Sequence, residues 1–186
     1  MAEIRALISQ LAAPDTAARE AAARELYRLG SALGDSAVAA WRSDPQLASL
    51  LAGPPTVGVA VEPKNFEAIH SAMVRPNLAE VPPDQDAREF ELILGPARLD
   101  ILTTRDPAGG GAIARFLEKI GEGIQQVEYP TTDVDRATRL VCEQFGLAAV
   151  YPTTRAGADG TRVNFFLAVT PEGRKVLIEL VESPPK

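Results

Sequence analysis

The stretch AIARFLEKIGEGIQQVEY, residues 112–129, joins a predicted helix directly to a predicted strand. Its first part predicts a helix that ends at Gly121, because glycine is typical just past a helix C-terminus. Its second part continues as IQQVEYP, residues 124–130, and predicts an extended strand. A helix-to-strand switch within a chain of 186 residues predicts a mixed fold that contains both kinds of element.

The predicted elements on the two sides of this stretch follow the same order. On the N-terminal side they are a strand at 56–61, a helix around 63–73 and strands at 88–94 and 97–104. On the C-terminal side, after the strand at 124–130, they are a helix at 133–146 and strands at 147–153, 162–169 and 175–182. A strand, a helix and then further strands, two in the first half and three in the second, indicate an internal duplication of a βαβββ module.

The first 53 residues are alanine-rich and read as helices. Apolar residues from Ile4 to Leu11 recur at i, i+3, i+4 and i+7, which predicts one stripe of an amphipathic helix. Asp15 is placed as the N-cap of a second helix that is predicted to end at Gly30. Shorter helices are expected at 37–42 and, after an Asp44 N-cap, at 45–51.

The change of pattern predicts two domains. Residues 1–53 form a helical segment, and residues 56–186 form an α+β domain with modules at about 56–104 and 124–183, linked by a helix at about 111–120. The helical hairpin resembles a unit of a HEAT-type repeat, which is too little for a solenoid. It is either a module that binds a protein partner or a helical cap packed on the second domain.

The composition is that of a globular protein, with 46% hydrophobic and 24% charged residues. The net charge of -6 argues against a nucleic-acid partner, because a phosphate backbone would be repelled. A single cysteine, Cys142, excludes an intrachain disulfide. Neither a signal-peptide pattern nor a run of 18 apolar residues is present, so we expect a cytoplasmic protein without a membrane span.

Residues 56–183 resemble methylmalonyl-CoA epimerases of the vicinal-oxygen-chelate (glyoxalase/bleomycin-resistance) superfamily. The most specific stretches are AIARFLEKIGEGIQQVEY, the DVDRA helix start at 133–137, RVNFF at 162–166 and VLIELVE at 176–182. The resemblance implies an α+β fold in which paired βαβββ modules form an open barrel-like sheet, preceded here by the small all-helical segment. It also implies a ligand cleft on the concave face of the sheet.

In that family, four side chains on the concave face bind a divalent metal, usually two histidines and two Glu or Gln residues. The resemblance carries these positions to Thr56, Asp100, Gln126 and Glu179, so that both histidines are replaced. The internal duplication supports the same pairs, since 126 − 56 = 70 and 179 − 100 = 79. The predicted ligand cleft comprises Thr56, Gly58, Asp100, Gln126, Glu128 and Asn164.

The side chains at these four positions determine which metal ion the site could bind. Thr, Asp, Gln and Glu offer only oxygen ligands, which suit Mg²⁺, Mn²⁺ or Ca²⁺ better than zinc or cobalt. Asp100, Gln126 and Glu179 are the candidate ligands of such an ion. The alternative is that no metal binds and that Gln126 makes hydrogen bonds between the acids. The only histidine, His70, lies in a predicted helix and is expected to be a packing or surface residue.

Epimerisation next to a thioester needs a base on each face of the substrate carbon and a group that holds the enolate oxygen. By resemblance, Glu89 and Glu179 are the two proton-transfer residues and the substrate is acyl-CoA-like. Glu179 lies between Ile178 and Leu180 in an apolar strand, where an unpaired carboxylate would be costly. Glu89 could instead be a solvated acid on an edge strand.

Other functions of the same fold stay open. A cleft without chemistry could sequester a small ligand, as in bleomycin-resistance relatives, whose clefts usually form between two chains of a homodimer. Residues 1–53 could bind a protein partner. The sequence therefore predicts a glyoxalase-like protein that binds a small molecule, either as an isomerase that transfers a proton next to a carbonyl or as a non-catalytic binding protein.

Overall fold

The computed structural model describes residues 2–184, which divide into two compact units. Unit 1 comprises the N-terminal residues up to Gly30 together with Thr56–Gln125. Unit 2 comprises Ser31–Pro55 together with the residues from Gln126 onward. Each unit thus combines part of the helical N-terminus with one predicted module. The predicted α+β class with a helical N-terminal segment is confirmed, whereas two domains with a boundary at 53–56 stay a prediction.

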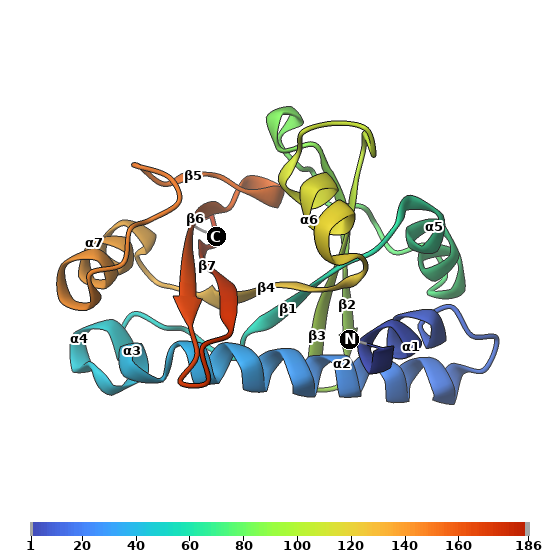
Figure 1. The fold of residues 1–186 in the computed structure, drawn as a ribbon, viewed down its shortest axis with the longest axis horizontal. Helices are drawn as coiled ribbons and strands as arrows, with labels where there is room; N and C mark the ends of the chain where they lie inside the picture. The colour runs from blue at the N-terminus through green and yellow to red at the C-terminus, as the bar shows by residue number, and fades with distance from the viewer. Residues whose placement is uncertain (1, 185–186) are drawn as a thin grey trace. The chain divides into compact units, whose positions relative to one another are not determined.

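Unit 1 contains a sheet in which the strands lie in the order β2-β3-β1 (Figure 1). β2 and β3 form an antiparallel hairpin, and β1 pairs with β3 in parallel. The elements of unit 1 are α1 (Ala2–Gln10), the first part of α2 (Thr16–Ala37), β1 (Thr56–Ala60), α5 (Pro63–Ala72), the 3-10 turn η1 (Pro83–Gln85), β2 (Ala87–Leu94), β3 (Ala97–Thr104) and α6 (Ala112–Ile120).

The core of unit 1 lies on one face of this sheet. Alternate residues of a strand share a face, so Val57 and Val59 of β1 point to the same side, with Phe90 of β2 on that side too. Phe66 of α5 and Leu26 of α2 pack against them. The apolar stripe of α1 is buried in the same core, through residues that include Ile8. Packing of the N-terminal helices on the strands agrees with the interpretation of residues 1–53 as a cap.

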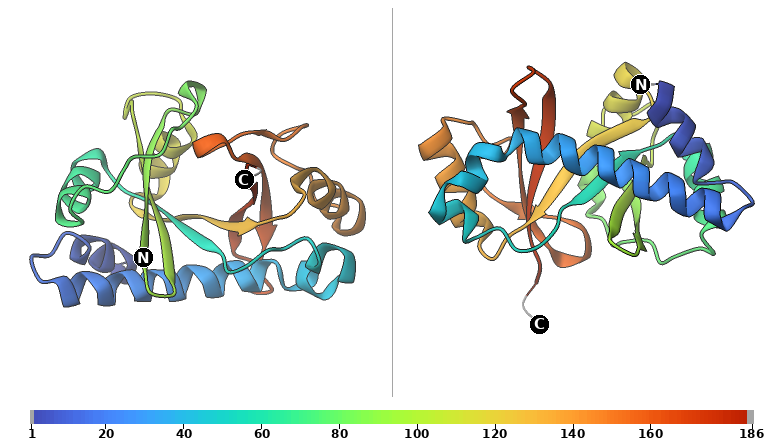
Figure 2. Two further views of the ribbon diagram at one scale, coloured as in Figure 1. Left: turned by 180° about the vertical axis from the view of Figure 1, so that it is seen from behind. Right: turned by 90° about the horizontal axis from the view of Figure 1, so that it is seen from below.

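The predicted end of the second helix at Gly30 is wrong, because α2 continues to Ala37. Gly30 and Gly34 lie four residues apart on one helix face. A Cβ at Gly30 would overlap the side chain of Val57, and one at Gly34 would lie 2.6 Å from Cγ1 of Val127. Both glycines therefore permit close contact between the helix and a strand. The course of α2 can be followed in the view from below (Figure 2).

The predicted N-caps are confirmed at two helices. The carboxylate of Asp15 accepts hydrogen bonds from the backbone N–H groups of Ala17 and Ala18, at 3.3 and 3.1 Å. The carboxylate of Asp44 accepts one from Leu47, at 2.8 Å. Each carboxylate satisfies N–H groups that have no partner within the helix, which is why these helices begin where the sequence predicts.

Unit 2 contains a sheet in the order β4-β7-β6-β5. β4 and β7 are parallel, and the other neighbours are antiparallel. The elements of unit 2 are the end of α2, α3 (Ala39–Ser43), α4 (Pro45–Ala48), β4 (Gly123–Pro130, from Gln126 on), α7 (Val134–Phe145), β5 (Arg155–Ala156), the 3-10 turn η2 (Ala158–Gly160), β6 (Arg162–Val169) and β7 (Lys175–Glu182).

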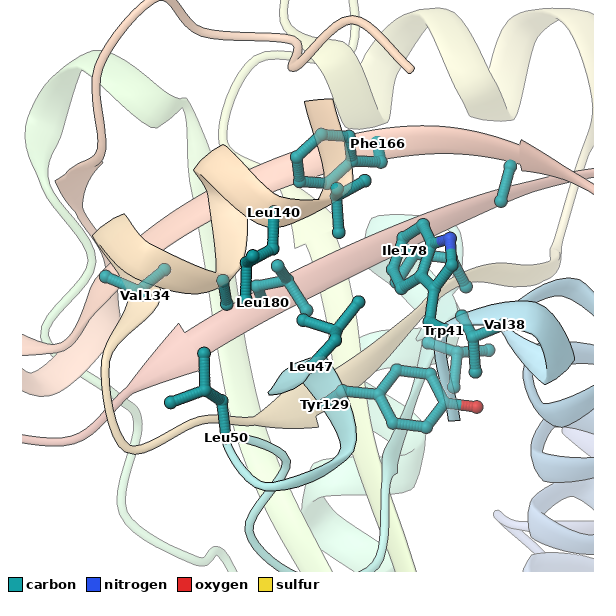
Figure 3. Packing of buried hydrophobic residues seen from close by; sticks show 14 of the residues in the cluster. Val38, Trp41, Leu47, Leu50, Tyr129, Val134, Leu140, Phe166, Ile178 and Leu180 are labelled. Atoms are coloured by element: carbon teal, nitrogen blue, oxygen red, sulfur yellow. The ribbon is translucent and has the colours of Figure 1, made fainter. Parts of the chain in front are cut away.

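The core of unit 2 forms between its sheet and the helices α3, α4 and α7 (Figure 3). Trp41 of α3 meets Phe166 of β6 edge-to-face, with ring centroids 5.7 Å apart. The hydroxyl of Tyr129 donates a hydrogen bond to the carboxylate of Asp35. Burial of the hydroxyl, together with the negative charge of Asp35, raises the pKa of Tyr129 far above its ordinary value. Cys142 is half-buried against this core.

The strand predicted at 147–153 does not form. In its place, Ala149 makes a single bridge to Phe166, and the nearest strand is the two-residue β5. In unit 1, no strand lies between α5 and β2 among the described residues, and Ala79 only donates a hydrogen bond to the carbonyl of Glu89. Both segments contain proline, which lacks the N–H that a ladder needs. The first of the last three strands of a βαβββ module is therefore residual in unit 2 and is absent from the described residues of unit 1.

Candidate functional site

The sheet of unit 2 has one face toward its core and one face away from it. Ile178 and Leu180 of β7 and Val127 of β4 are core residues, so the alternating positions between them belong to the other face. We call this second face the site face. It carries Gln126 and Glu128 of β4, Glu179 of β7 and, by the same alternation, Phe165 of β6.

Glu179 is the central acid of the site face. Its residue is only 7% exposed, although the two neighbours in β7 are apolar core residues. Nε2 of Gln126 donates to Oε2 of Glu179 at 2.6 Å and to Oε1 of Glu128 at 3.1 Å. A buried carboxylate is stable only when it is hydrogen-bonded, and Gln126 supplies one such bond. The predicted contact of Gln126 with an acid is thus present, and its second partner is Glu128.

The strand registers of the two units repeat each other. Glu128 of β4 lies opposite Glu179 of β7, and Gly58 of β1 lies opposite Asp100 of β3. The two pairs are related by the predicted offsets, since 128 − 58 = 70 and 179 − 100 = 79. On its other side, Asp100 lies opposite the exposed Glu91 of β2. The duplicated position therefore holds two facing acids in unit 2 and one acid beside a glycine in unit 1.

The other predicted residues of unit 1 lie on the sheet face away from its core. Thr56, at the start of β1, is half-buried and alternates with the core residue Val57. Glu89 of β2 is half-buried and alternates with the core residue Phe90. Asp100 of β3 is half-buried as well, and it takes part in interactions within the protein. These positions agree with the predicted parity of each strand.

Asn164 lies on the other face of β6 from Phe165. It pairs with Leu180, which is a core residue, and it is fully buried. Its amide oxygen accepts hydrogen bonds from the backbone N–H groups of Tyr151 and Phe165 at 3.3 and 2.9 Å, and its nitrogen donates to the carbonyl of Tyr151 at 3.2 Å. Asn164 therefore holds the Tyr151 loop and does not belong to the site face, which corrects its placement in the ligand cleft.

His70 is buried on the core side of the unit 1 sheet. Its ring is 5.0 Å from that of Phe90 and stacks on that of Phe66 at 6.1 Å. Nε2 lies 2.8 Å from the carbonyl oxygen of Pro76, which makes that nitrogen the donor of a structural hydrogen bond. The prediction of a packing residue is confirmed, and the only imidazole of the chain is not on the face that carries Asp100.

These donors do not fit the metal centre of the vicinal-oxygen-chelate fold, which combines imidazole nitrogen with oxygen ligands. The candidate positions offer only oxygen, and in unit 2 the amide nitrogen of Gln126, not its oxygen, is directed at the carboxylates of Glu128 and Glu179. Among the described residues, no group of three or more His, Cys, Asp or Glu side chains is arranged to hold a metal ion.

The sequence did not indicate which residues surround Glu179. Phe165 lies directly opposite it in the β6–β7 register, and the ring of Tyr151 packs edge-to-face on Phe165 at 6.0 Å. The guanidinium of Arg155 lies over the Tyr151 ring, 4.5 Å from its centroid. The period of two in RVNFFLAV could have placed Phe165 beside Glu179, but only the pairing of β5 with β6 shows where Arg155 lies.

Several solved structures resemble the chain. A crystal structure of methylmalonyl-CoA epimerase from Mycobacterium tuberculosis is 35% identical, and the match covers 74% of this chain and 91% of that one, with a TM-score of 0.58. A Streptomyces coelicolor methylmalonyl-CoA epimerase variant in complex with 2-nitronate-propionyl-CoA is 27% identical over 72% of this chain and 95% of that one, with a TM-score of 0.55.

A further methylmalonyl-CoA epimerase, in complex with methylmalonyl-CoA and NH4+, is 26% identical over 73% of this chain and 94% of that one, with a TM-score of 0.53. No protein-family model matches the chain, and no curated protein matches it. Across residues 2–184, no helix has both the length and the apolar character needed to cross a membrane.

Proposed function

Because the chain belongs to the family of methylmalonyl-CoA epimerases, whose members have the vicinal-oxygen-chelate fold, we propose that it transfers a proton at the carbon next to a thioester carbonyl. The observation that carries this proposal is the buried carboxylate of Glu179 on the site face, hydrogen-bonded to Gln126 at 2.6 Å. An acid kept in an apolar strand at a cost in stability is typical of a functional group.

The proposed step needs no redox partner. The carboxylate of Glu179 removes the proton from the α-carbon, and the electron pair of that C–H bond moves toward the carbonyl, so that an enolate forms on the thioester oxygen. Return of a proton to the opposite face of the same carbon restores the C–H bond with inverted configuration. Gln126 keeps the carboxylate of Glu179 in one orientation through its amide N–H.

Glu89 remains the candidate for the second proton-transfer residue, as the family resemblance implies. Thr56, Gly58, Asp100 and Glu128 remain the candidate residues of the ligand cleft. Support for these assignments comes from strand parity, which puts each of them on a sheet face away from the core of its own unit. The proposed substrate class is an acyl-CoA. The proposed step does not involve a divalent ion, and the experiment tests separately whether such an ion affects the rate.

The test is exchange of the α-proton for solvent deuterium. Propionyl-CoA and methylmalonyl-CoA are incubated with the protein in D₂O, and the mass of the acyl group is followed by mass spectrometry. We expect enzyme-dependent incorporation of one deuterium at the α-carbon of methylmalonyl-CoA, which carries a single hydrogen, and of up to two at the α-carbon of propionyl-CoA. The Glu179→Gln variant should lose at least about 100-fold of the rate, the lower range for loss of a general base. Glu89→Gln should also lose activity if Glu89 carries the second proton.

Two controls test whether the loss of exchange is specific to the proposed residues and whether exchange depends on a divalent ion. Glu143→Gln changes an exposed acid of α7 and should leave the exchange rate unchanged. Dialysis against EDTA, followed by addition of Mg²⁺, Mn²⁺ or Co²⁺, shows whether exchange depends on a divalent ion. Full exchange by the Glu179→Gln, Glu89→Gln double variant would refute the proposed proton transfer. Binding of the thioester without any exchange would instead establish the non-catalytic ligand-binding function of the same fold.

A further inference from the structure

Removal of the α-proton leaves a negative charge on the thioester oxygen, and the residues around Glu179 differ in whether they can hold it. The amide nitrogen of Gln126 already donates to the carboxylates of Glu128 and Glu179, so both of its N–H groups are directed at acids and not at a substrate oxygen. The oxygen donors of this site do not fit the metal centre of the fold. A cationic side chain on the same surface is the group suited to the developing charge.

Two cations on the described strands of unit 2 have the register of the site face. Lys175 begins β7, four residues before Glu179, and therefore shares its side of the strand. Arg155 of β5 lies opposite Val163 of β6, and Val163 lies opposite Val181 of β7, two residues after Glu179. Directly opposite residues of an antiparallel pair have their side chains on the same face, so Arg155 and Glu179 belong to one surface.

Ring contacts distinguish Arg155 from Lys175. The Arg155 guanidinium lies over the ring of Tyr151, 4.5 Å from its centroid, where the ring quadrupole attracts the cation. The Tyr151 ring meets that of Phe165 edge-to-face at 6.0 Å, and Phe165 lies directly opposite Glu179. These contacts connect the guanidinium to the immediate neighbour of the acid. Lys175 is exposed at the end of its strand.

The segment that carries Tyr151 and Arg155 is held in place by the fold. The amide of Asn164 accepts from the backbone N–H of Tyr151 and donates to its carbonyl oxygen, at 3.3 and 3.2 Å. The hydroxyl of Thr154 donates to the carboxylate of Asp135 in α7 at 2.8 Å. Arg155 has further contacts within the protein. A cation that is fixed before the substrate arrives needs no reorganisation when the charge develops.

The spacing between Arg155 and Glu179 is compatible with one reaction centre between them. Two inter-strand steps and two residues along the strand put their Cα atoms roughly 12 Å apart. The α-carbon and the thioester oxygen are separated by two bonds, and the base and the oxyanion donor each act from about 3 Å, so the two groups need to lie roughly 7–8 Å apart. Long side chains on one face can reach this separation.

We propose that Arg155, held on the Tyr151 ring, donates hydrogen bonds to the enolate oxygen of the thioester and thereby supplies the positive charge that stabilises the enolate. This inference rests on the proposed function. Glu179 takes the α-proton, the electron pair of the C–H bond moves to the oxygen, and the guanidinium keeps all of its protons; the electron pair returns when the carbon is protonated again. Arg155 is a catalytic residue. Tyr151 and Asn164 are positioning residues, because they act through Arg155.

The experiment measures kcat and KM for deuterium exchange with three thioesters. Propionyl-CoA has phosphates and no free carboxylate, methylmalonyl-CoA has both, and propionyl-pantetheine has neither. We expect Arg155→Gln to lower kcat at least about 100-fold for all three, as for loss of an oxyanion donor, with KM changed less than about threefold because the charge develops only in the transition state. Arg155→Lys should keep part of the rate, since it keeps the charge without the planar fork.

The matched control is Lys175→Gln, which removes the other cation of the site face and should leave kcat unchanged for each thioester. A kcat that survives Arg155→Gln would overturn the inference. Loss confined to methylmalonyl-CoA would assign Arg155 to the substrate carboxylate and overturn it. A raised KM for the two CoA thioesters, with propionyl-pantetheine unaffected, would assign Arg155 to the carrier and overturn it as well.

Chemical rescue tests the same role in a second variant. Methylguanidinium added to Arg155→Gly should restore exchange in a saturable manner, and the same addition to Glu179→Gln should not. Rescue of neither variant, with melting temperatures unchanged from the unmodified protein, would count against a guanidinium at the enolate. Tyr151→Leu should lower kcat about three- to tenfold through loss of the cation–ring contact, whereas Tyr151→Phe, which keeps the ring, should retain the rate.

Failure of this inference is distinguishable from failure of the proposed function. An unmodified protein that gives no exchange with any of the three thioesters would refute the proposed proton transfer, and the enolate role of Arg155 with it. Exchange in the unmodified protein that depends on Glu179 and not on Arg155 would refute the role of Arg155 alone. Exchange that depends on both residues for all three thioesters is the result expected.

Discussion

The two units share a strand register but differ in the side chains placed on it. In unit 2, Glu128 and Glu179 face each other and Gln126 donates a hydrogen bond to both. In unit 1, the equivalent register pairs Asp100 with Gly58, which has no side chain. A duplicated backbone thus supports a hydrogen-bonded acid pair in one module and a more open acid in the other. The comparison shows that unit 2 buries a hydrogen-bonded acid, Glu179, whereas unit 1 places the half-buried Asp100 opposite a glycine.

The largest expected difference between the units concerns proton transfer. Glu179→Gln should lower deuterium exchange at the α-carbon of propionyl-CoA by at least about 100-fold, because it removes the base. Asp100→Asn, the same change at the duplicated position, should lower it by less than about tenfold. Both rates are measured by mass spectrometry. Equal losses of exchange rate in the two variants would show that the two acids do not differ in role. A larger loss in Asp100→Asn would indicate that the base lies in unit 1.

The next largest effect is on the free energy of unfolding and concerns the two glycines, Gly30 and Gly34, at which α2 contacts a strand. Gly34→Ala should lower the free energy of unfolding by about 2 kcal/mol, since its Cβ would lie 2.6 Å from Val127 and 2.7 Å from the Tyr129 hydroxyl. Gly30→Ala should cost more, because its Cβ would overlap Val57. Urea unfolding measures both. The exposed position of Ala32 is the control, where Ala32→Gly should cost about 1 kcal/mol through helix propensity alone.

A smaller effect separates Gln126 of β4 from Thr56 of β1, which are equivalent in the duplication. Gln126→Leu should lower the free energy of unfolding by roughly 1–2 kcal/mol, because the buried Glu179 carboxylate loses its 2.6 Å hydrogen bond. Thr56→Val, at the equivalent place in unit 1, should change it by less than about 0.5 kcal/mol. Thermal and urea unfolding at pH 7 test this pair. Similar values for the two variants would show that Gln126 does not stabilise the acid.

The smallest effect on the free energy of unfolding concerns two equivalent ion pairs, one within each unit. Each ties the module helix to a strand: Glu67 of α5 to Arg88 of β2 at 2.7 Å, and Asp135 of α7 to Arg162 of β6 at 2.6 Å. Both pairs are partly exposed, so Glu67→Gln and Asp135→Asn should each cost no more than about 0.5 kcal/mol at pH 7. Urea unfolding measures both variants.

The ion pair of unit 2 also affects stability at acid pH. The hydrogen bond from Arg162, with a further one from Thr154, holds the pKa of Asp135 below its ordinary value of 3.8. A carboxyl with a lowered pKa in the folded state contributes stability above its ordinary pKa and loses it as the pH falls through the folded value. Asp135→Asn should therefore flatten the acid side of the stability curve slightly. A curve unchanged below pH 5 would contradict this.

Prediction from sequence succeeded where the signal is local. The strands at 56–60, 87–94, 97–104 and 123–130 form close to their predicted limits, because alternation of apolar residues over several positions reflects which face is buried. Capping by Asp15 and Asp44 was also predictable, since a cap acts within three residues. The same reasoning failed at Gly30, where glycine is compatible with both a helix end and a close helix–strand contact.

Failures at the site have a different cause. Asn164 is polar and lies in a strand of the matching region, so sequence alone favours a ligand role, yet pairing with Leu180 turns it toward the core. Arg155 carries no sequence signal, because its importance comes from the Tyr151 ring beneath it and from the β5–β6 pairing. Contacts of this kind join residues that no periodicity links.

The sequence by itself determined the order of the elements, the internal duplication and the acids at 100 and 179, because strand parity and motif spacing are properties of neighbouring residues. Only the tertiary structure decided that Gln126 bridges Glu128 and Glu179, that His70 is a core residue and that Arg155 shares the surface of Glu179. The physical reason is that hydrogen bonds and ring contacts depend on strand register across the sheet, which is set when separate segments pack together.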